Sequence, residues 1–454
     1  MTYALDRLGW LQFQQVCTRL LELEAGIGPD TWVGDADGVR YARYEPGIGP
    51  PLVPHELPGP TLVQCAPTRT TLDSATAAVA RLAHRGPEAL WGLGSFLLMS
   101  DSRLGEPMGE PERAGATRLW IMDATALSER IDALPQLRLE QPSLLGLREL
   151  ESLLDPEAVR RSTLDLPSVI ELARAFAPTR AHARALAVLD AHHFAVLTGP
   201  PEMGKTAIAR IIALAHMTGG FQAHECTSPD DLWRAFDDGA SQVFVADDAF
   251  GCTEYRPENA ERWARAMERL LRTLDERHLL LWTSRPAPLH AALDHLHRER
   301  GAERFPSPGR VLVDAGELDV TEKALILLRH AKAAQLAPKL RGRLRRHGPM
   351  IVADRHFTPE RIRRLVLALS QGESDVLAAA ETQLTTPTEA MTRSLASLDD
   401  EHRDLLVALL DTGPGPVHER ELAAALRRHR DGDLRRPPGE LVQRLADHFL
   451  RVLA

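Results

Sequence analysis

The sequence predicts an α/β protein with a parallel β-sheet at its centre, a second α/β region before that sheet and helices after it. Apolar strand-like runs alternate with helix-like segments between residues 194 and 313, which is typical of a parallel sheet. A glycine-rich phosphate-binding motif joins the first of these runs to a helix. From Thr321 the pattern is helical almost to the end of the chain. The 454 residues correspond to about three domains, at about 150 residues each.

The first region, residues 1–140, begins with an amphipathic helix and continues with short runs bounded by Pro and Gly. These runs are expected to be strands at 61–64, 95–99 and 118–122. The Gly-, Pro- and Glu-rich stretch 104–116 is expected to be a surface loop. Residues 141–180 are polar and helical in pattern, and we interpret them as a linker.

The alternating region supplies the strands and helices of the parallel sheet. Its strands are expected at 194–197, 222–226, 242–246, 279–283 and 310–313. Its longest helices are expected from Lys205 onward and over 258–275. Near the end of the chain, amphipathic helices are expected at about 400–411, 417–429 and 439–453.

Composition and charge exclude several classes of protein. No apolar run approaches the roughly 18 to 20 residues that cross a bilayer, and charged residues lie where a signal peptide needs an apolar core. We therefore expect a cytoplasmic protein with no membrane contact. The net charge of −9 gives no overall attraction to nucleic acid, although it allows a local basic patch. The cysteines Cys17, Cys65, Cys226 and Cys252 lack the spacing of a disulfide framework or a zinc site.

Lysine is scarce, and its positions limit where lysine chemistry can occur. Only four of the 54 basic residues are lysines, namely Lys205, Lys323, Lys332 and Lys339. The first 204 residues contain none. A lysine-dependent active site is therefore excluded from the N-terminal region.

Residues 199–206 match the phosphate-binding pattern GxxxxGK[ST] at every fixed position, between an apolar strand and a helix. In such a P-loop the backbone N–H groups and the helix N-terminus attract phosphates. The lysine reaches the β- and γ-phosphates, and the following hydroxyl binds Mg²⁺. The predicted nucleotide-binding residues are Gly199, Pro200, Pro201, Glu202, Met203, Gly204, Lys205 and Thr206.

The ends of two further strands are expected to complete this site. Asp247 is suited to hold Mg²⁺, together with Thr206, and Asp248 to orient the attacking water. Thr283 could sense the γ-phosphate and Arg285 could neutralise its charge. Taken alone, the acids can equally be a solvated strand end or a helix cap, and the arginine can belong to a surface loop. The P-loop about 40 residues upstream favours the catalytic interpretation.

Together these motifs resemble the STAND class of P-loop NTPases, in particular its novel third group. The resemblance covers about 180–454, and the matching segments are 197–206, 244–251, 282–289, 326–331 and 357–364. It implies a P-loop core of the ASCE/AAA-like type over 181–318, a helical lid over 319–396 and a winged-helix-like region over 397–454.

The same resemblance implies a slow nucleotide-gated switch of bacterial antiphage or conflict systems, with ATP, ADP and Mg²⁺ as ligands. Pro359 would contact the adenine, and Arg361 or Arg363 would approach the phosphates. Nucleotide exchange would drive the assembly of a homo-oligomer. The trigger would be a separate sensor or a phage-derived molecule.

The N-terminal region resembles a restriction-endonuclease-like domain of the Mrr type, on residues 11–13, 34–42 and 59–66. In that family an Asp and a second acid or Gln hold Mg²⁺, and a Lys supplies positive charge. Here Tyr41 stands at the position of the Asp and Ala66 at that of the Lys, although acidic and amide side chains remain nearby. We therefore expect a degenerate, non-cutting domain. The corresponding positions are Asp37, Tyr41, Glu45, Gln64 and Ala66.

Two alternatives to the switch remain open from the sequence. One is a DNA-binding ATPase or regulator that uses the basic runs at 339–346 and 427–436. The other is an active Mg²⁺-dependent nuclease in which Asp37 or Glu45 serves a rearranged site.

Overall fold

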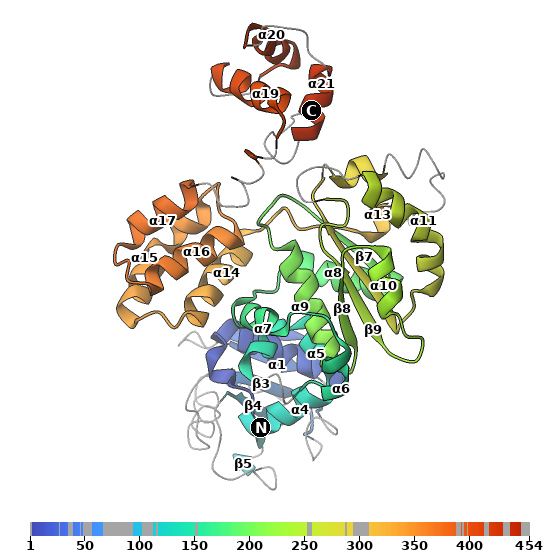
Figure 1. The fold of residues 1–454 in the computed structure, drawn as a ribbon. Helices are drawn as coiled ribbons and strands as arrows, with labels where there is room; N and C mark the ends of the chain where they lie inside the picture. The colour runs from blue at the N-terminus through green and yellow to red at the C-terminus, as the bar shows by residue number, and fades with distance from the viewer. Residues whose placement is uncertain are drawn as a thin grey trace. The chain divides into compact units, whose positions relative to one another are not determined.

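The chain folds into two compact units, Met1–Leu154 and Asp155–Ala454, and each is described by itself (Figure 1). The computed structural model describes residues 2–26, 28–34, 40–45, 47–48, 57–66, 94–101, 112–114, 117–149, 153–251, 257–286, 288–293, 308–386, 392, 395–396, 398–412, 417–429 and 436–445. Asp37 and Cys252 lie outside the described residues.

The described part of the first unit contains a mixed sheet. Its strands lie in the order β1 (Thr31–Gly34), β2 (Arg40–Tyr44), β3 (Thr61–Ala66), β4 (Ser95–Ser100), β6 (Thr117–Met122) and β5 (Glu112–Ala114). The first three strands form an antiparallel meander, whereas β3, β4 and β6 run parallel. The three strands that the sequence predicts here are confirmed, and each extends one or two residues beyond the predicted bounds.

One expectation for this unit is wrong in part. The sequence predicts a surface loop over 104–116, but Glu112–Ala114 forms β5 and pairs antiparallel with β6. This pairing gives hydrogen-bond partners to backbone N–H and C=O groups that would otherwise be exposed at the edge of β6. Because β5 is short, it exposes few unpaired backbone groups at its own outer edge. Residues 104–111 and 115–116 lie outside the described residues.

Helices cover one face of this sheet and form the core with it. Helix α1 (Trp10–Ala25), helix α4 (Ala124–Ala133) and the 3-10 helix η1 (Leu5–Arg7) contribute buried side chains to the same apolar cluster as alternate residues of β2, β3, β4 and β6. Helix α5 (Pro135–Glu140) and the 3-10 helix η2 (Pro142–Leu147) join this cluster through Leu137, Leu144 and Leu147. The beginning of the predicted linker is therefore part of the first core.

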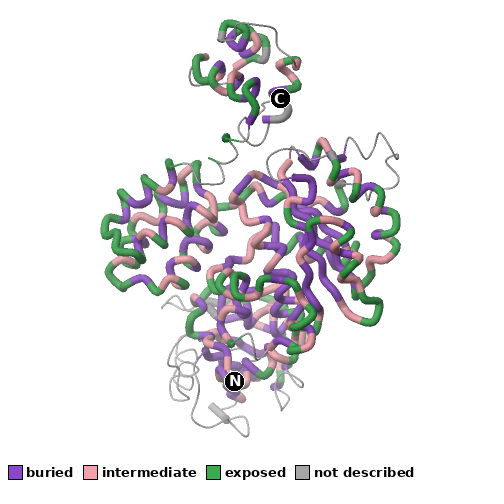
Figure 2. Tube along the Cα trace, viewed as in Figure 1, coloured by how far each residue is buried: buried purple, intermediate pink, exposed green. Residues whose placement is uncertain are grey.

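The second unit is built on a parallel sheet, as the sequence predicts. Its strands lie in the order β11 (Leu312–Asp314), β7 (Phe194–Thr198), β10 (His278–Ser284), β9 (Gln242–Ala246) and β8 (Gln222–Cys226). All neighbouring pairs are parallel. Figure 2 shows the central strands as buried along their length. Since β10 lies between β7 and β9, the ends of these three strands meet at one edge.

The helices of this unit begin close to the predicted positions. Helix α9 (Lys205–Met217) starts at the predicted residue, and helix α11 (Pro257–Thr273) matches the predicted 258–275 within two residues. Helices α8 (Arg180–His192) and α10 (Pro229–Ala235) flank them along the chain. The strand predicted at 310–313 is wrong in part, because Pro308–Val311 forms the short helix α13 and only Leu312–Asp314 forms β11.

The later part of the predicted linker belongs to the second unit. It forms helices α6 (Pro156–Arg161) and α7 (Leu166–Ala175). Ser162, directly after α6, accepts a hydrogen bond from the backbone N–H of Ala223 in β8 (2.9 Å). Residues of the predicted helical linker 141–180 therefore contribute to both folded units.

Helices α14 (Val320–Ala333), α15 (Pro338–Ala353), α16 (Pro359–Ser370) and α17 (Val376–Thr385) follow the sheet, and we name them the lid segment. Their shared core contains Ile326, Ile351, Leu365 and Ala380. Helices α19 (Asp400–Asp411), α20 (Glu419–His429) and α21 (Pro438–Leu445) form a separate small core around Leu405, Leu426 and Leu441. Among the described residues, none of the helices is both long enough and apolar enough to cross a bilayer.

Candidate nucleotide-binding site

The turn between β7 and α9 has the backbone geometry of a phosphate-binding loop. Gly199 has φ 142° and Gly204 has φ 89°, which are angles that favour glycine. A Cβ at Gly199 would lie 2.9 Å from the backbone N of Gly316. The residues after β11 therefore pack directly on the loop, and Ala315 donates a backbone hydrogen bond to Thr198 (2.8 Å).

Lys205 is buried inside this loop. Its Nζ donates hydrogen bonds to the carbonyl oxygens of Gly199 (2.8 Å) and Pro200 (2.7 Å). Burial lowers the pKa of Lys205 to about 8, and the nearby carboxylate of Asp248 opposes this shift. The only lysine of the second unit outside the lid segment thus lies where the motif requires an ammonium group.

Three side-chain oxygens from three elements converge beside the loop. Thr206 Oγ1, at the start of α9, donates to Asp247 Oδ1 (2.7 Å), directly after β9. Thr283 Oγ1, near the end of β10, donates to the same oxygen (2.5 Å). Thr283 Oγ1 also accepts the backbone N–H of Asp248 (2.9 Å). The structure thus brings Thr206, Asp247 and Thr283 together, as the sequence predicts for strand ends at one edge.

Aromatic packing behind these oxygens holds them in place. The ring of Trp282, one residue before Thr283, contacts Phe194 of β7, Phe250 of the turn after β9 and Trp263 of α11. The ring centroids lie 4.9, 5.1 and 4.9 Å from that of Trp282, respectively. All four side chains are fully buried. The turn that carries Asp247 and Asp248 is therefore fastened to the core through Phe250.

Hard oxygen donors at this position fit a Mg²⁺ ion. Proteins usually bind Mg²⁺ through one or two carboxylates together with substrate phosphates, so a cluster of acids is not required. Among the described residues there is no group of three or more His, Cys, Asp or Glu side chains that could hold a metal. The exposed carboxylate of Asp247 and the hydroxyl of Thr206 match this smaller set of Mg²⁺ ligands.

The second acid, Asp248, has an unusual backbone. Its φ of 46° is left-handed, which costs a non-glycine residue about 1 to 2 kcal/mol. Gly251 donates to the carbonyl of Asp248 (2.8 Å), and Ala249 donates to that of Thr283 (3.1 Å), so the turn fixes this conformation. Burial raises the pKa of the Asp248 carboxyl, and the charge of Asp247 raises it further. Such perturbed acids are common at functional sites.

Arg285 follows β10 by one residue and lies within electrostatic range of the loop. Its positive charge lowers the pKa of both Lys205 and Asp248, after the larger effects described above. The structure therefore places Arg285 near Lys205, which the sequence assigns to the phosphates, and near Asp248, which it assigns to the attacking water.

The lid segment contacts the loop through Glu202. Thr358, the residue that caps α16, donates to Glu202 Oε2 at 3.4 Å. Pro359 is the next residue and the first of α16. Glu202 has a left-handed φ of 68°, and burial raises the pKa of its carboxyl, whereas the charge of Arg361 lowers it.

Arg361 makes hydrogen bonds within the lid segment. Its guanidinium is buried and donates to the carbonyl oxygens of His356 (3.3 Å) and Leu384. Its hydrogen bonds thus join the connection between α15 and α16 to the end of α17. Sequence reasoning also missed Thr358 and Gly316, for which the only local signals are a cap residue before Pro and a glycine after a strand.

The described nuclease-like positions lie on β2 and β3 of the first unit. Ala42 pairs with Val63, and both side chains belong to the core under α1. Because side chains alternate along a strand, Tyr41 and Gln64 point to the opposite face. The ring of Tyr41 is buried and lies 6.2 Å from that of Phe96.

The other positions differ in their surroundings. Glu45 is exposed and accepts a hydrogen bond from Arg43 Nε (2.8 Å), and its backbone N–H donates to Asp30 (2.7 Å). The backbone of Ala66 pairs with Ser100 of β4. Asp37 lies outside the described residues, so the structure brings together only part of the predicted set.

Several solved structures resemble the chain at low identity. A mutant of RuvB from Thermotoga maritima is 17% identical, with 56% of this chain and 86% of that chain covered and a TM-score of 0.33. The Aeropyrum pernix ORC1 protein in complex with DNA is 14% identical, with coverages of 60% and 84% and a TM-score of 0.35. Cdc6p from Pyrobaculum aerophilum is 14% identical, with coverages of 61% and 87% and a TM-score of 0.28.

No curated protein shows significant similarity to the chain. Residues 176–333 match the family model of novel STAND NTPase 3. This segment contains the P-loop, the two acids after β9, all five strands of the parallel sheet and helix α14. Over these residues the chain is therefore similar to the novel STAND NTPase 3 family, as its motifs predict.

Proposed function

We propose that the protein is a nucleotide-gated switch that binds ATP and hydrolyses it slowly. The observation that carries this proposal is the convergence of Thr206, Asp247 and Thr283 beside the buried Lys205. A strand end that served only as a solvated cap would not need hydroxyls from two other elements on one carboxylate oxygen. The family match of residues 176–333 supports the same interpretation.

The residues of the loop would bind the triphosphate in distinct ways. Backbone N–H groups of 199–206 and the N-terminus of α9 would attract the phosphate oxygens. Lys205 would exchange its two carbonyl partners for phosphate oxygens. Thr206 and Asp247 would hold Mg²⁺, which neutralises phosphate charge when bound.

Asp248, Thr283 and Arg285 would act on the reacting groups. Asp248 would orient the attacking water and accept its proton, a role for which a raised pKa is suited. Thr283 would sense the γ-phosphate through its position beside Asp247, and Arg285 would offset the negative charge. Asp248 has a short side chain on a fixed left-handed backbone, which restricts its reach and supports slow turnover.

The lid segment would couple nucleotide to assembly. Pro359 would contact the base, and Arg361 would act by holding α16 to the end of α17. Exchange of ADP for ATP would release the lid segment and the helices from α19 onward, so that copies of the chain associate. This is the behaviour of a cytoplasmic antiphage or conflict-system switch whose trigger is a separate sensor or a phage-derived molecule.

The first unit would serve as an effector or docking module of nuclease ancestry. Its support is the order of elements, namely a helix, an antiparallel meander of three strands and then a parallel fourth strand. Tyr41 is a poor Mg²⁺ ligand at neutral pH, since its phenol ordinarily titrates near 10. Ala66 offers no positive charge. Both observations support a domain that does not cut.

The test combines nucleotide identification with size measurement. The purified full chain is denatured and its released nucleotide is identified, and its mass is then measured by light scattering in ADP and in a non-hydrolysable ATP analogue. Retained ADP and a larger species with the ATP analogue are expected. A protein of one size in both nucleotides would refute the switch while leaving the ATP site intact, and a protein that binds neither would refute both.

A further inference from the structure

The lid segment contains an excess of basic residues although the chain as a whole is acidic. The net charge of the chain is −9, yet residues 319–386 contain 12 Lys and Arg against 7 Asp and Glu. Three of the four lysines of the chain lie here. The most concentrated run is in α15, whose 16 residues include no Asp or Glu.

The basic side chains of α15 face solvent because its apolar side is used by the fold. Leu344, Ile351 and Val352 are buried in the core of the lid segment. Lys339, Arg343 and Arg346 recur at helical spacing on an exposed side and span about 10 Å of helix. Exposed Arg341 and Arg345 extend the basic surface around the helix.

These cations differ from three exposed arginines on other helices of the same unit. On α11, Arg265 pairs with Glu261 and Arg272 pairs with Glu268, one turn away. On α6, Arg161 pairs with Glu157 (3.0 Å). No ion pair to another described residue is made by the basic side chains of α15, namely Lys339, Arg341, Arg343, Arg345 and Arg346. A basic surface that served only solubility would not require its Lys and Arg side chains to lack Asp or Glu partners.

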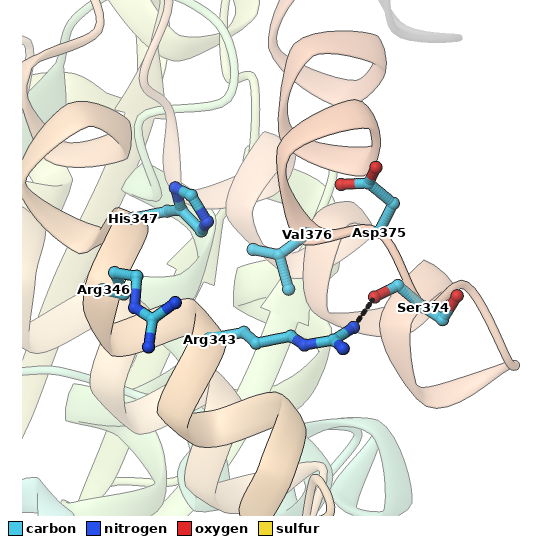
Figure 3. Close-up of a pocket in the computed structure, with 6 residues that line it drawn as sticks. All are labelled: Arg343, Arg346, His347, Ser374, Asp375 and Val376. Atoms are coloured by element: carbon cyan, nitrogen blue, oxygen red, sulfur yellow. Dashed lines mark hydrogen bonds between the residues drawn. The ribbon is translucent and has the colours of Figure 1, made fainter.

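A hollow of about 390 Å³ lies beside this surface, between α15 and the beginning of α17. Figure 3 shows Arg343, Arg346 and His347 on one wall and Ser374 and Asp375 on the other. Arg343 Nη1 donates to the carbonyl of Ser374 (3.0 Å), which holds its guanidinium at the rim of the hollow.

The acid in this hollow is engaged elsewhere. Asp375 Oδ1 accepts the backbone N–H groups of Leu377 (2.9 Å) and Ala378 (3.2 Å) and so caps α17. In Figure 3 its carboxylate points away from Arg343. The arginines therefore remain available to an anionic group that enters from solvent.

We propose that α15 and this hollow form a binding surface for the phosphate backbone of duplex DNA. Several cations on a rigid helix without paired acids match a polymer that presents regularly spaced phosphates. The phosphate nearest the hollow would bind between Arg343 and Arg346, and Lys339 and the outer arginines would contact neighbouring phosphates.

The composition of the surface favours duplex DNA over two other polyanions. Single strands are usually held by stacking on aromatic side chains, and α15 contains no Phe, Tyr or Trp. A membrane-surface helix inserts an apolar side, whereas the apolar side of α15 is in the protein core.

The experiment measures binding of the full chain to a short fluorescein-labelled DNA duplex by anisotropy, without nucleotide, over about 50 to 200 mM salt. The test variant is Arg343→Glu with Arg346→Glu. The matched control is Arg184→Glu with Arg262→Glu, which changes the charge equally at exposed positions on α8 and α11. Arg343→Lys with Arg346→Lys preserves the charge and checks that the helix tolerates substitution.

The expected result is duplex binding by the wild type that weakens steeply with salt. The double Glu variant should lose about tenfold in affinity and flatten the log–log salt slope by about 2, since two phosphate contacts are removed. The control and the double Lys variant should bind within about threefold of the wild type. The proposal is overturned if the wild type does not bind duplex at low salt or if the Glu variant and the control weaken equally. It is also overturned if single-stranded DNA or anionic vesicles bind more tightly than the duplex.

Discussion

Thr358 of the lid segment donates a hydrogen bond of 3.4 Å to Glu202 of the P-loop, across 156 positions of sequence. Glu202 reaches this partner from a left-handed backbone that glycine would adopt without strain. The loop that would hold the phosphates and the helix that carries Pro359 are thus joined through a strained residue. Observed strain of this kind is a reason to look for a function.

Replacing Glu202 tests whether this contact retains nucleotide. Glu202→Gly should relax the backbone and detach the lid segment, so ADP release should become faster by up to about tenfold, the range of one hydrogen bond. Glu202→Gln keeps a side chain that can accept from Thr358 and should release ADP at a rate near that of the wild type. Stopped-flow release of a fluorescent ADP analogue provides the rate. Slower release from the Gly variant would show that the carboxylate repels the phosphates and does not hold the lid.

Lys205 is expected to be essential for nucleotide affinity. Lys205→Ala removes the buried ammonium group that contacts Gly199 and Pro200, and the loop keeps no other cation at that point. Affinity for ATP should fall by about 10- to 100-fold, because a charged hydrogen bond to phosphate contributes about 1.5 to 3 kcal/mol. Isothermal calorimetry measures the change, with Lys323→Ala as a control in the lid segment. Equal affinity in the two variants would contradict the P-loop assignment.

The carboxylate of Asp247 is expected to bind Mg²⁺ and not the base or the ribose of the nucleotide. Asp247→Asn keeps the hydrogen bonds from Thr206 and Thr283 but weakens Mg²⁺ binding, since a neutral amide replaces the carboxylate. Nucleotide should still bind, whereas phosphate release should drop by about 100-fold and should require a higher Mg²⁺ concentration in any residual activity. A malachite-green assay across a Mg²⁺ titration reports both quantities. Normal turnover at the usual Mg²⁺ concentration would place the metal ligand elsewhere.

His182 predicts a pH dependence of stability. It is 1% exposed, and burial lowers its pKa to about 4. The unfolded chain binds this proton below about pH 6.5 and the folded chain does not, so its contribution to the free energy of unfolding falls as pH drops from 6.5 towards 4. The loss is at most about 3 kcal/mol. Urea unfolding at several pH values should show a weaker acid destabilisation in His182→Gln than in the wild type. The same pH slope in both proteins would exclude His182 as its source.

Restoring the missing chemistry tests the ancestry of the first unit. Tyr41→Asp with Ala66→Lys returns a carboxylate to β2 and an amine to β3, on strands that are neighbours in the sheet. Plasmid nicking that requires Mg²⁺ is expected from the double variant and not from the wild type. Because Tyr41 is buried against Phe96, circular dichroism must first show that the variant remains folded. Mg²⁺-dependent cutting by the wild type that Asp37→Ala abolishes would instead establish a rearranged live site.

The parallel sheet and the P-loop were predictable because their signals are local. Strands such as Phe194–Thr198 and Gln242–Ala246 are short, mainly apolar runs with clear boundaries, and the motif at 199–206 fixes residue types at fixed spacing. Parallel strands end at the same edge, so the approach of Thr206 to Asp247 could be anticipated without coordinates. The shared edge of parallel strands thus predicts a contact between residues that are far apart in sequence.

Contacts that no fold rule supplies could not be predicted. Nothing in the sequence near Glu202 indicates that Thr358 will contact it, and nothing near Arg361 indicates that its guanidinium donates to the carbonyl of Leu384. The strand β5 was missed because three residues carry too little periodicity to outweigh the surrounding Gly and Pro. In each case the deciding partner lies far away in sequence.

The distribution of lysines makes the protein unusually simple to follow with amine-specific reagents. Lys205 is buried, and the other three lysines are partly or fully accessible in the lid segment. An endoproteinase that cuts after lysine has no site in the first 204 residues, and its three sites outside the P-loop lie in α14 and α15, where cutting requires local opening of the helix. The rate at which those few bonds are cut in ADP and in ATP would report the exposure of the lid segment, with no label added to the chain.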